Sequence, residues 1–288
     1  MHQRVSMKAL LLHVGADSTD FRTLRVNAPI FDGELFEFIP IVEFWGSRKK
    51  YAYIRKKNGK SVVEYHGDME SIEVWTEENR AYSDALSRNN QHGKTLADFI
   101  PSEYNDVVMH FDPDFENMTY GDRENTSKGK QISRLKHGDY LFFVSSLVPF
   151  EEETYAFRTA SHMRDCQKGR MAKYVIGFFK VQESYYALKF IDDDYLLLSS
   201  EISHDVMARI KQNAHTKRTS DEYHIVVGDL KQSALLPRAV KLTENGSPFN
   251  PSPIGFKVYG NKCFPRGFKW VYNTDGINYL LELASCEI

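Results

Sequence analysis

The clearest chemical grouping in this 288-residue chain is the segment that starts at His110 and reads HFDPD. It places one histidine beside Asp112 and Asp114, and Asp122 follows after a tyrosine and a glycine. Clustered carboxylates with a histidine can hold a divalent cation or act as general acid and base. The pattern therefore predicts His110, Asp112, Asp114 and Asp122 as a catalytic group. The alternative is structural, because Asp and Pro are ordinary turn residues whose carboxylates cap local N–H groups.

A second group follows the apolar run from Ala9 to Leu12, where His13, Asp17 and Ser18 stand in sequence. Ligands of open α/β sheets bind beyond the carboxyl ends of strands, so these three residues are predicted ligand-binding residues. A plain turn from strand to loop is the alternative. The chain has no glycine-rich dinucleotide motif and no phosphate-loop lysine, which excludes the standard nucleotide sites.

Two basic segments suit phosphate groups. Asn213, His215, Lys217 and Arg218 follow a predicted helix and resemble a phosphate clamp, although cations are also common at helix carboxyl ends. The segment from Arg48 to Lys60 has no acidic residue and contains two tyrosines. Its cations suit a nucleic-acid backbone, or else a charged strand edge that resists aggregation. The predicted backbone contacts there are Lys49, Lys50, Arg55, Lys56 and Lys57.

Alternating and apolar patterns indicate the elements that position these residues. Strands are expected over residues 8–14, 36–41, 106–111, 139–145, 174–181, 185–191 and 223–227, with helices over 76–91 and 203–212. Asn58-Gly59 predicts a tight hairpin turn between residues 51 and 65. Residues 120–131 are predicted as a loop, and the last 45 residues as long loops with short strands.

We expect strand 106–111 to lie parallel to the first strand. Parallel neighbours end at the same edge of a sheet, so Asp112 and Asp114 would then share a solvent-accessible cleft with His13 or Asp17.

The composition bounds the class of protein. Hydrophobic residues make up 42% of the chain and the net charge is only −2, so a large core is expected and a histone-like positive coat is excluded. The three cysteines match no zinc spacing and favour a reducing compartment, for which we predict the cytoplasm. No membrane span is expected. The interpretation is one α/β domain over residues 1–288, of the α+β type, with a weak subdivision near 130–136.

Several segments together resemble the nucleotide modification-associated domains of the third type. The resemblance rests on residues 7–17, 28–33, 36–41, 110–114, 120–122, 135–143, 213–215 and 227–229 with Ser233. It implies a protein that acts on or recognises a modified nucleobase or nucleotide, in DNA modification or phage defence. A non-catalytic reader of modified bases and an interaction subunit of such a complex are the alternatives. Tyr120 and Ser145 complete the predicted ligand-binding residues.

Residues 136–144 and 174–181 also resemble the core of PUA-like barrels of the ASCH and EVE groups. That resemblance implies a mixed sheet or β-barrel core with a few peripheral helices and long loops. Its aromatic pocket walls would be Tyr140, Phe142, Phe178, Tyr185 and Tyr186, unless these rings belong to an ordinary core.

Overall fold

The computed structural model describes residues 7–14, 28–31, 33–36, 38, 41–42, 73–74, 108–110, 113–150, 170–191, 194–196, 202–213, 223–260, 262–264 and 267–285. At 41–42, 73–74, 108–110, 186–191, 194–196 and 247–249 the description is limited to the backbone. The predicted basic hairpin with its Asn58-Gly59 turn and the predicted helix over 76–91 lie outside these ranges.

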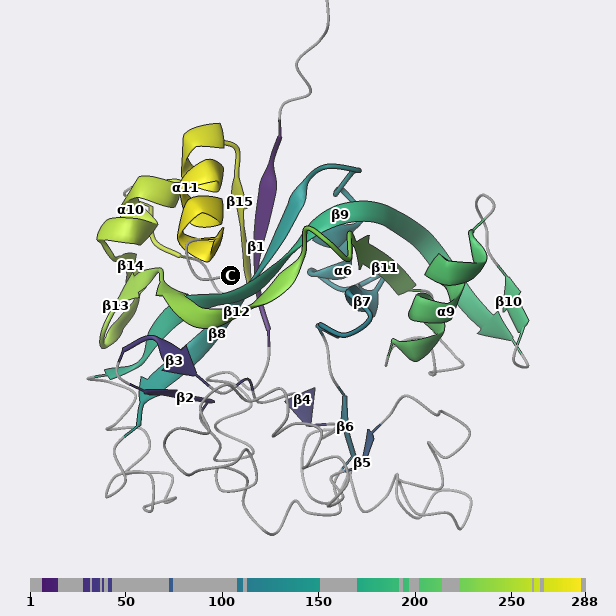
Figure 1. The fold of residues 1–288 in the computed structure, drawn as a ribbon, viewed down its shortest axis with the longest axis horizontal. Coiled ribbons are helices and arrows are strands. Elements are labelled where there is room, and N and C mark those ends of the chain that lie inside the picture. Colours follow the sequence, from purple (N-terminus) through teal and green to yellow (C-terminus); the bar gives the residue numbers. More distant parts are fainter. Residues whose placement is uncertain are drawn as a thin grey trace, which may run out of the picture.

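One mixed sheet dominates the described part of the chain (Figure 1), and ten strands form it. Its main path runs β15-β1-β8-β9-β11-β7, with β2, β3, β10 and β12 attached at the sides. The strands are β1 (Ala9–His13), β2 (Ala28–Phe31), β3 (Leu35–Phe36), β7 (Thr119–Arg123), β8 (Tyr140–Pro149), β9 (Ala172–Ile191), β10 (Asp194–Leu196), β11 (Tyr223–Gly228), β12 (Ala234–Lys241) and β15 (Phe268–Val271).

The strand β1 is buried along its whole length, as its apolar sequence predicts. It pairs in parallel with β8 and antiparallel with β15. A strand covered on both faces can consist of apolar residues without alternation, which explains the run from Ala9 to Leu12. The predicted strands over 8–14 and 139–145 are thus confirmed.

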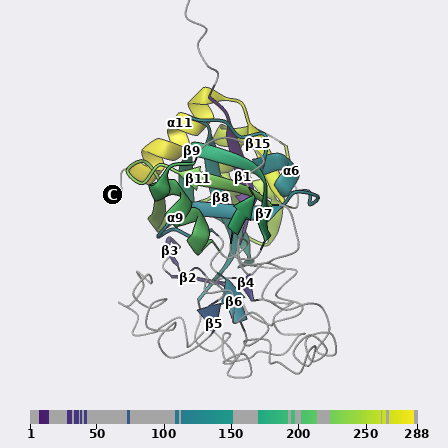
Figure 2. The same ribbon diagram turned by 90° about the vertical axis from the view of Figure 1, so that its right-hand side faces the viewer.

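The strand β9 spans 20 residues and pairs with β8, β10, β11 and β12. We expected two strands here, and that prediction was wrong because the polar run from Gln182 to Ser184 continues the strand instead of turning. Register shifts against three of its partners bend the ladder. The sheet curls as a result, and Tyr120 of β7 packs on Phe143 of β8 with 5.6 Å between ring centroids. Figures 1 and 2 show this half-barrel, which confirms an α+β fold with a mixed sheet.

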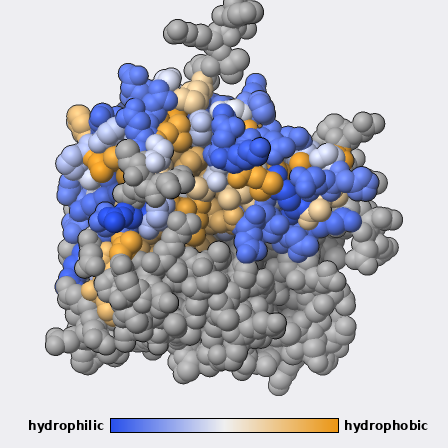
Figure 3. All heavy atoms as spheres, viewed as in Figure 1, coloured by the Kyte–Doolittle hydropathy of each residue, from blue (hydrophilic) through white to orange (hydrophobic). Residues whose placement is uncertain are grey.

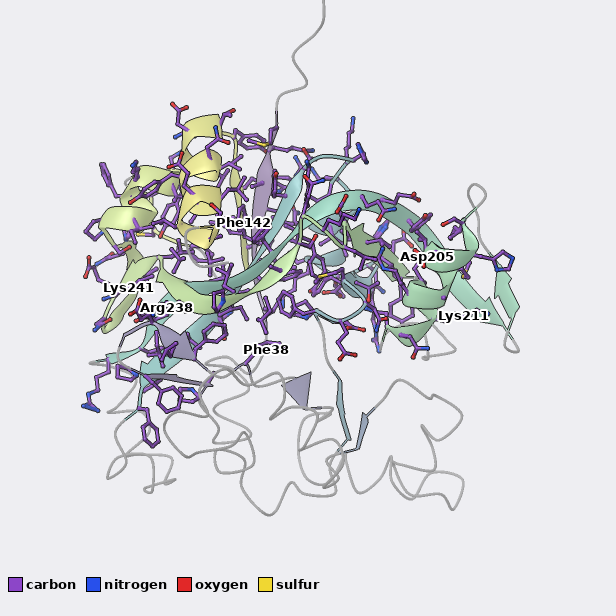
Figure 4. The ribbon with its side chains drawn as sticks, in the orientation of Figure 1. Phe38, Phe142, Asp205, Lys211, Arg238 and Lys241 are labelled. Atoms are coloured by element: carbon purple, nitrogen blue, oxygen red, sulfur yellow. The ribbon has the colours of Figure 1, made fainter. Side chains whose placement is uncertain are left out.

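Two apolar clusters lie on the two faces of the curled sheet. The inner cluster gathers side chains such as Leu10, Phe143 and Phe179 inside the curl. The outer cluster lies between the sheet and the helices α10 (Pro253–Tyr259) and α11 (Thr274–Ser285), and includes Phe142, which Figure 4 shows beside α11. Figure 3 shows apolar residues gathered in a band across this view, with hydrophilic residues on both sides.

The helix α9 (His204–Gln212) confirms the predicted helix over 203–212. The Ser203 hydroxyl caps it by accepting the N–H of Val206. Asp205 and Lys211 lie at opposite ends of the helix, each with the charge that suits the helix dipole there (Figure 4).

Two predicted loops are ordered elements. Residues 120–131 contain most of β7 and the start of α6 (Gly129–Ile132). The last 45 residues contain α10 and α11, and the signals we assigned to loops are helix ends: Ser252 caps α10, Pro253 stands in its first turn and Gly260 ends it. No helix in the described ranges is both long and apolar enough to cross a membrane.

Two small sheets complete the described strands. β13 (Thr243–Glu244) pairs with β14 (Ser247–Pro251), and β6 (Val108–His110) pairs with both β4 (Ile41–Val42) and β5 (Glu73–Val74). His110 is therefore on a strand, as predicted. The expectation that this strand is a neighbour of the first one was wrong, because the described neighbours of β1 are β8 and β15.

Candidate functional site

A row of three polar side chains lies at the end of the outer apolar face of the sheet. On this face β1, β8 and β9 carry the apolar residues Leu11, Val144 and Val175. The next residue on the same face of each strand is polar: His13, Ser146 and Lys173, respectively. Val144 lies directly opposite His13, and Ser146 lies directly opposite Lys173. The period-two geometry of strands therefore turns all three side chains to one face.

His13 and Ser146 form a hydrogen bond within this row. The distance from His13 Nε2 to Ser146 Oγ is 2.9 Å, and the two residues are only 6% and 4% exposed. When Nδ1 carries the ring hydrogen, Nε2 accepts the hydroxyl proton of Ser146. A histidine in this position can act as a general base on a neighbouring hydroxyl.

Lys173 adds a buried positive charge to the row. It is 4% exposed, and its Nζ lies 4.5 Å from the ring centroid of Phe264. The β1–β15 ladder extends to this point, because the His13 N–H donates to the carbonyl of Gly267 at 2.7 Å. A lysine in such surroundings can bind a phosphate or stabilise a developing anion.

Ser145 lies on the opposite, inner face of β8, between Phe143 and Leu147 of the inner cluster. Its Oγ is buried and has no hydrogen-bond partner among the described residues. Buried hydroxyls usually have a partner, so Ser145 is a polar contact that a ligand or water inside the curl would satisfy. Ser145 and the His13–Ser146 pair therefore face different sides of the sheet.

Asp114 has the contacts of a turn cap. Its carboxylate accepts the backbone N–H groups of Glu116 and Asn117 and the side-chain amide of Asn117, all at 2.7–3.0 Å. Burial raises its pKa, while these hydrogen bonds act in the other direction. Asp114 also pairs with Thr119 through a backbone bridge, so it closes the turn that leads into β7.

Asp122 is also bonded locally. Its carboxylate accepts the N–H of Arg123 and the hydroxyl of Thr126, both at 2.7 Å. It stands opposite the buried His224 in the β7–β11 ladder. Burial lowers the pKa of His224, although Glu124 and Asp122 act in the other direction.

Tyr120 is part of β7, and Asn213 binds the first residue of that strand. Tyr120 belongs to the inner cluster, and the buried Asn213 donates from Nδ2 to Thr119 Oγ1 at 3.1 Å. Of the predicted site residues that the structure describes, Asp114, Tyr120, Asp122 and Asn213 thus gather around β7. His13 lies on β1, with three strands between β1 and β7 in the sheet order.

Of the remaining predicted site residues, His110 is described only by its backbone on β6, and the others are not described. Asp17, Ser18, Asp112, His215, Lys217 and Arg218 lie outside the described ranges, as do Lys49, Lys50, Arg55, Lys56 and Lys57. Within those ranges no group of three or more His, Cys, Asp or Glu side chains could hold a metal ion. The divalent cation that the sequence allowed therefore stays a prediction.

Three of the aromatic residues considered as pocket walls pack together, Tyr185 packs in another cluster, and the side chain of Tyr186 is not described. Tyr140 stacks on Phe142 with 6.0 Å between centroids, and Phe142 and Phe178 lie in the outer cluster. Tyr185 is buried beside α9 and donates its hydroxyl to Glu183. These four rings have the surroundings of a core.

Ser146, Lys173 and Arg209 are polar residues that sequence reasoning passed over. Each carries a signal in retrospect, because each interrupts an apolar stretch: Ser146 and Lys173 in buried strands, and Arg209 between Val206 and Ile210 on the buried face of α9. A charged residue is rarely buried without a specific partner.

The match to a family model covers the strands and residues of the candidate site. A family model described as nucleotide modification associated domain 3 matches residues 8–252, which include His13, Ser146, Lys173 and the β7 region. The chain belongs to this family. The predicted resemblance is thereby confirmed, whereas the barrel resemblance stays a prediction. Comparisons with curated proteins and with solved structures gave no match for this nucleotide modification associated domain.

Proposed function

We propose that this nucleotide modification associated domain binds a nucleotide or a modified nucleobase at the row of His13, Ser146 and Lys173, and acts on it there. The observation that carries the proposal is the buried His13–Ser146 hydrogen bond on the same face as the buried Lys173. The family description supplies the class of ligand. The setting we propose is cytoplasmic, in DNA modification or phage defence.

The chemistry of the three groups supports a displacement reaction. Lys173 would hold a phosphate of the ligand, and His13 would take the hydroxyl proton as Ser146 Oγ bonds to an electrophilic phosphorus or carbon. The bond to the leaving group breaks in this step, and His13 then returns the proton to that group. The position of His13 at the carboxyl end of a strand in a parallel pair is where α/β proteins bind ligands.

The test separates binding from chemistry. Deoxynucleoside monophosphates with unmodified and 5-substituted pyrimidines are titrated into the protein by calorimetry, and products are followed by mass spectrometry. Lys173→Met should lose binding at least tenfold, since the ammonium is removed but the volume is kept. Lys180→Met, on the same strand but bonded at the surface to Gln232, should bind as the wild type does.

Ser146→Ala should keep binding and lose turnover. Binding by the wild type without any product would favour the reader alternative, in which the same row recognises a modified base and performs no reaction. Equal affinities for the wild type and Lys173→Met would contradict the site. The absence of nucleotide binding would leave the interaction subunit as the better hypothesis.

A further inference from the structure

A pair of stacked aromatic rings lies at the edge of the large sheet. Trp270 of β15 and Tyr272, which follows the strand, have ring centroids 6.1 Å apart and planes inclined by only 16°. In the described part of the chain β15 pairs with β1 alone and ends the strand order, so this pair marks a sheet edge. Tyr272 is 60% exposed, which leaves most of its side chain in water.

Trp270 is held in place by polar groups. Its indole N–H donates to Gln131 Oε1 at 2.8 Å, and its ring packs against the inner cluster. Lys8 Nζ lies 4.9 Å and Arg134 Cζ 5.1 Å from the ring centroid, which are cation–π distances. Trp270 is thus a rigid support, and Tyr272 presents the accessible aromatic surface.

The neighbouring segment gives this aromatic pair a positive surrounding. Residues 127–138 hold four cations, Lys128, Lys130, Arg134 and Lys136, and no acidic residue. The next residue, Asp139, is buried, and its carboxylate lies 3.5 Å from Lys8 Nζ. The Lys8–Asp139 pair adds no net charge, so the positive charge beside Trp270 comes from the exposed Arg134, and the other three cations lie close to it in sequence. Asp275, in the first turn of α11, is an exposed acid three residues after Tyr272.

We propose that this surface, formed by Tyr272, Trp270, Lys8, Arg134 and the cations of residues 127–138, binds a single strand of nucleic acid. An unpaired base would stack on Tyr272, while Arg134 and its neighbouring lysines contact the phosphates. Aromatic stacking tolerates any base but needs one with a free face, which a duplex does not offer. The cations supply the part of the affinity that depends on salt.

The proposal is independent of the row at His13. That row lies on the outer face of the sheet. Lys8 is two residues before Leu10, directly ahead of β1, and Trp270 lies directly opposite Leu10, so both side chains are on the inner face with Leu10. The surface also reaches beyond the matched family range, since Tyr272 lies after residue 252. A nucleic-acid strand bound here would either be held as the substrate of the His13 row or be bound for a separate function.

The experiment is a fluorescence anisotropy titration with a labelled single-stranded oligonucleotide and with the matching duplex, over a range of salt. Stacking of one base on an aromatic ring predicts that Tyr272→Ala weakens single-strand binding roughly 5- to 150-fold, and Tyr272→Phe restores it. Arg134→Ala should lower the slope of log affinity against log salt by about 0.7, the value for one phosphate of a single strand.

Phe256→Ala is the matched control, because Phe256 is an aromatic residue that is 57% exposed on α10. It should bind the oligonucleotide like the wild type. The proposal is overturned if the wild type binds no single strand, if the duplex binds more tightly, or if Tyr272→Ala and Phe256→Ala have the same affinity. Lys173→Met should keep strand binding, so failure of the nucleotide site is distinguishable from failure of this surface.

Discussion

The carboxylate of Asp114 holds a turn together through two backbone N–H groups and one amide. We expect Asp114→Ala to lower the free energy of unfolding by about 1 kcal/mol, the usual cost of losing such a cap. Asp114→Asn keeps one acceptor oxygen for the two backbone groups and removes a buried charge, so its stability should remain within about 0.5 kcal/mol of the wild type. Urea denaturation of the three proteins measures both differences. Equal losses in the two variants would mean that the charge itself matters here.

His224 makes stability depend on pH. Burial lowers its pKa in the folded protein below the ordinary value of 6.5, so at acidic pH the unfolded chain binds a proton that the folded chain resists. The free energy of unfolding should therefore fall as the pH drops below about 6.5, down to the lower pKa of the folded state. Replacing the ring with an amide in His224→Gln should flatten this part of the profile. Parallel profiles for both proteins between pH 7.5 and 5 would count against this origin.

At the scale of elements, Arg209 ties α9 to the turn before β7 and to the end of β11. Its guanidinium donates to the carbonyls of Asn117, Met118 and Gly228. Burial lowers the pKa of Arg209, and nearby acids such as Asp205 partly offset this. These contacts replace the water that the three carbonyls lose when they are buried.

Arg209→Met should therefore lower the free energy of unfolding by about 3–5 kcal/mol, because it removes three hydrogen bonds from a charged donor, although the Met118 carbonyl keeps the N–H of Gly228. Lys211→Met changes an exposed residue on the same helix and should cost about 1 kcal/mol or less. Chemical denaturation compares the two. A loss in Arg209→Met no larger than in Lys211→Met would show that the clamp adds little.

The sequence predicted elements well where local signals agree, as in β1 and α9. It was wrong where one signal serves two structures. Ser252, Pro253 and Gly260 are typical loop residues, and here they start and end a helix. The residues of β7 were predicted as a loop because they are polar. The strand ends the main path of the sheet, and a strand at that position needs no continuous apolar run.

The site was partly predictable for a related reason. His13 could be selected because it ends an apolar run, but its partner Ser146 is 133 positions away. Only the register of β1 on β8 brings the two residues together, and register depends on the assembled sheet. The predicted Asp114 and Asp122 are real acceptors, yet their described partners are local.

At the scale of the whole molecule, β1 can pair in parallel with β8 only after the ribosome has synthesised β8. Lys8 and Asp139, which meet at the start of this pair, are 131 positions apart. At roughly 5–20 residues per second, a ribosome needs about 7–26 seconds to make the residues between them. During that time the apolar strand β1 has neither of its described neighbours, since β15 is made later still. An exposed strand of this kind invites pairing with other chains, so the growing polypeptide is a natural client for a chaperone that binds short apolar segments.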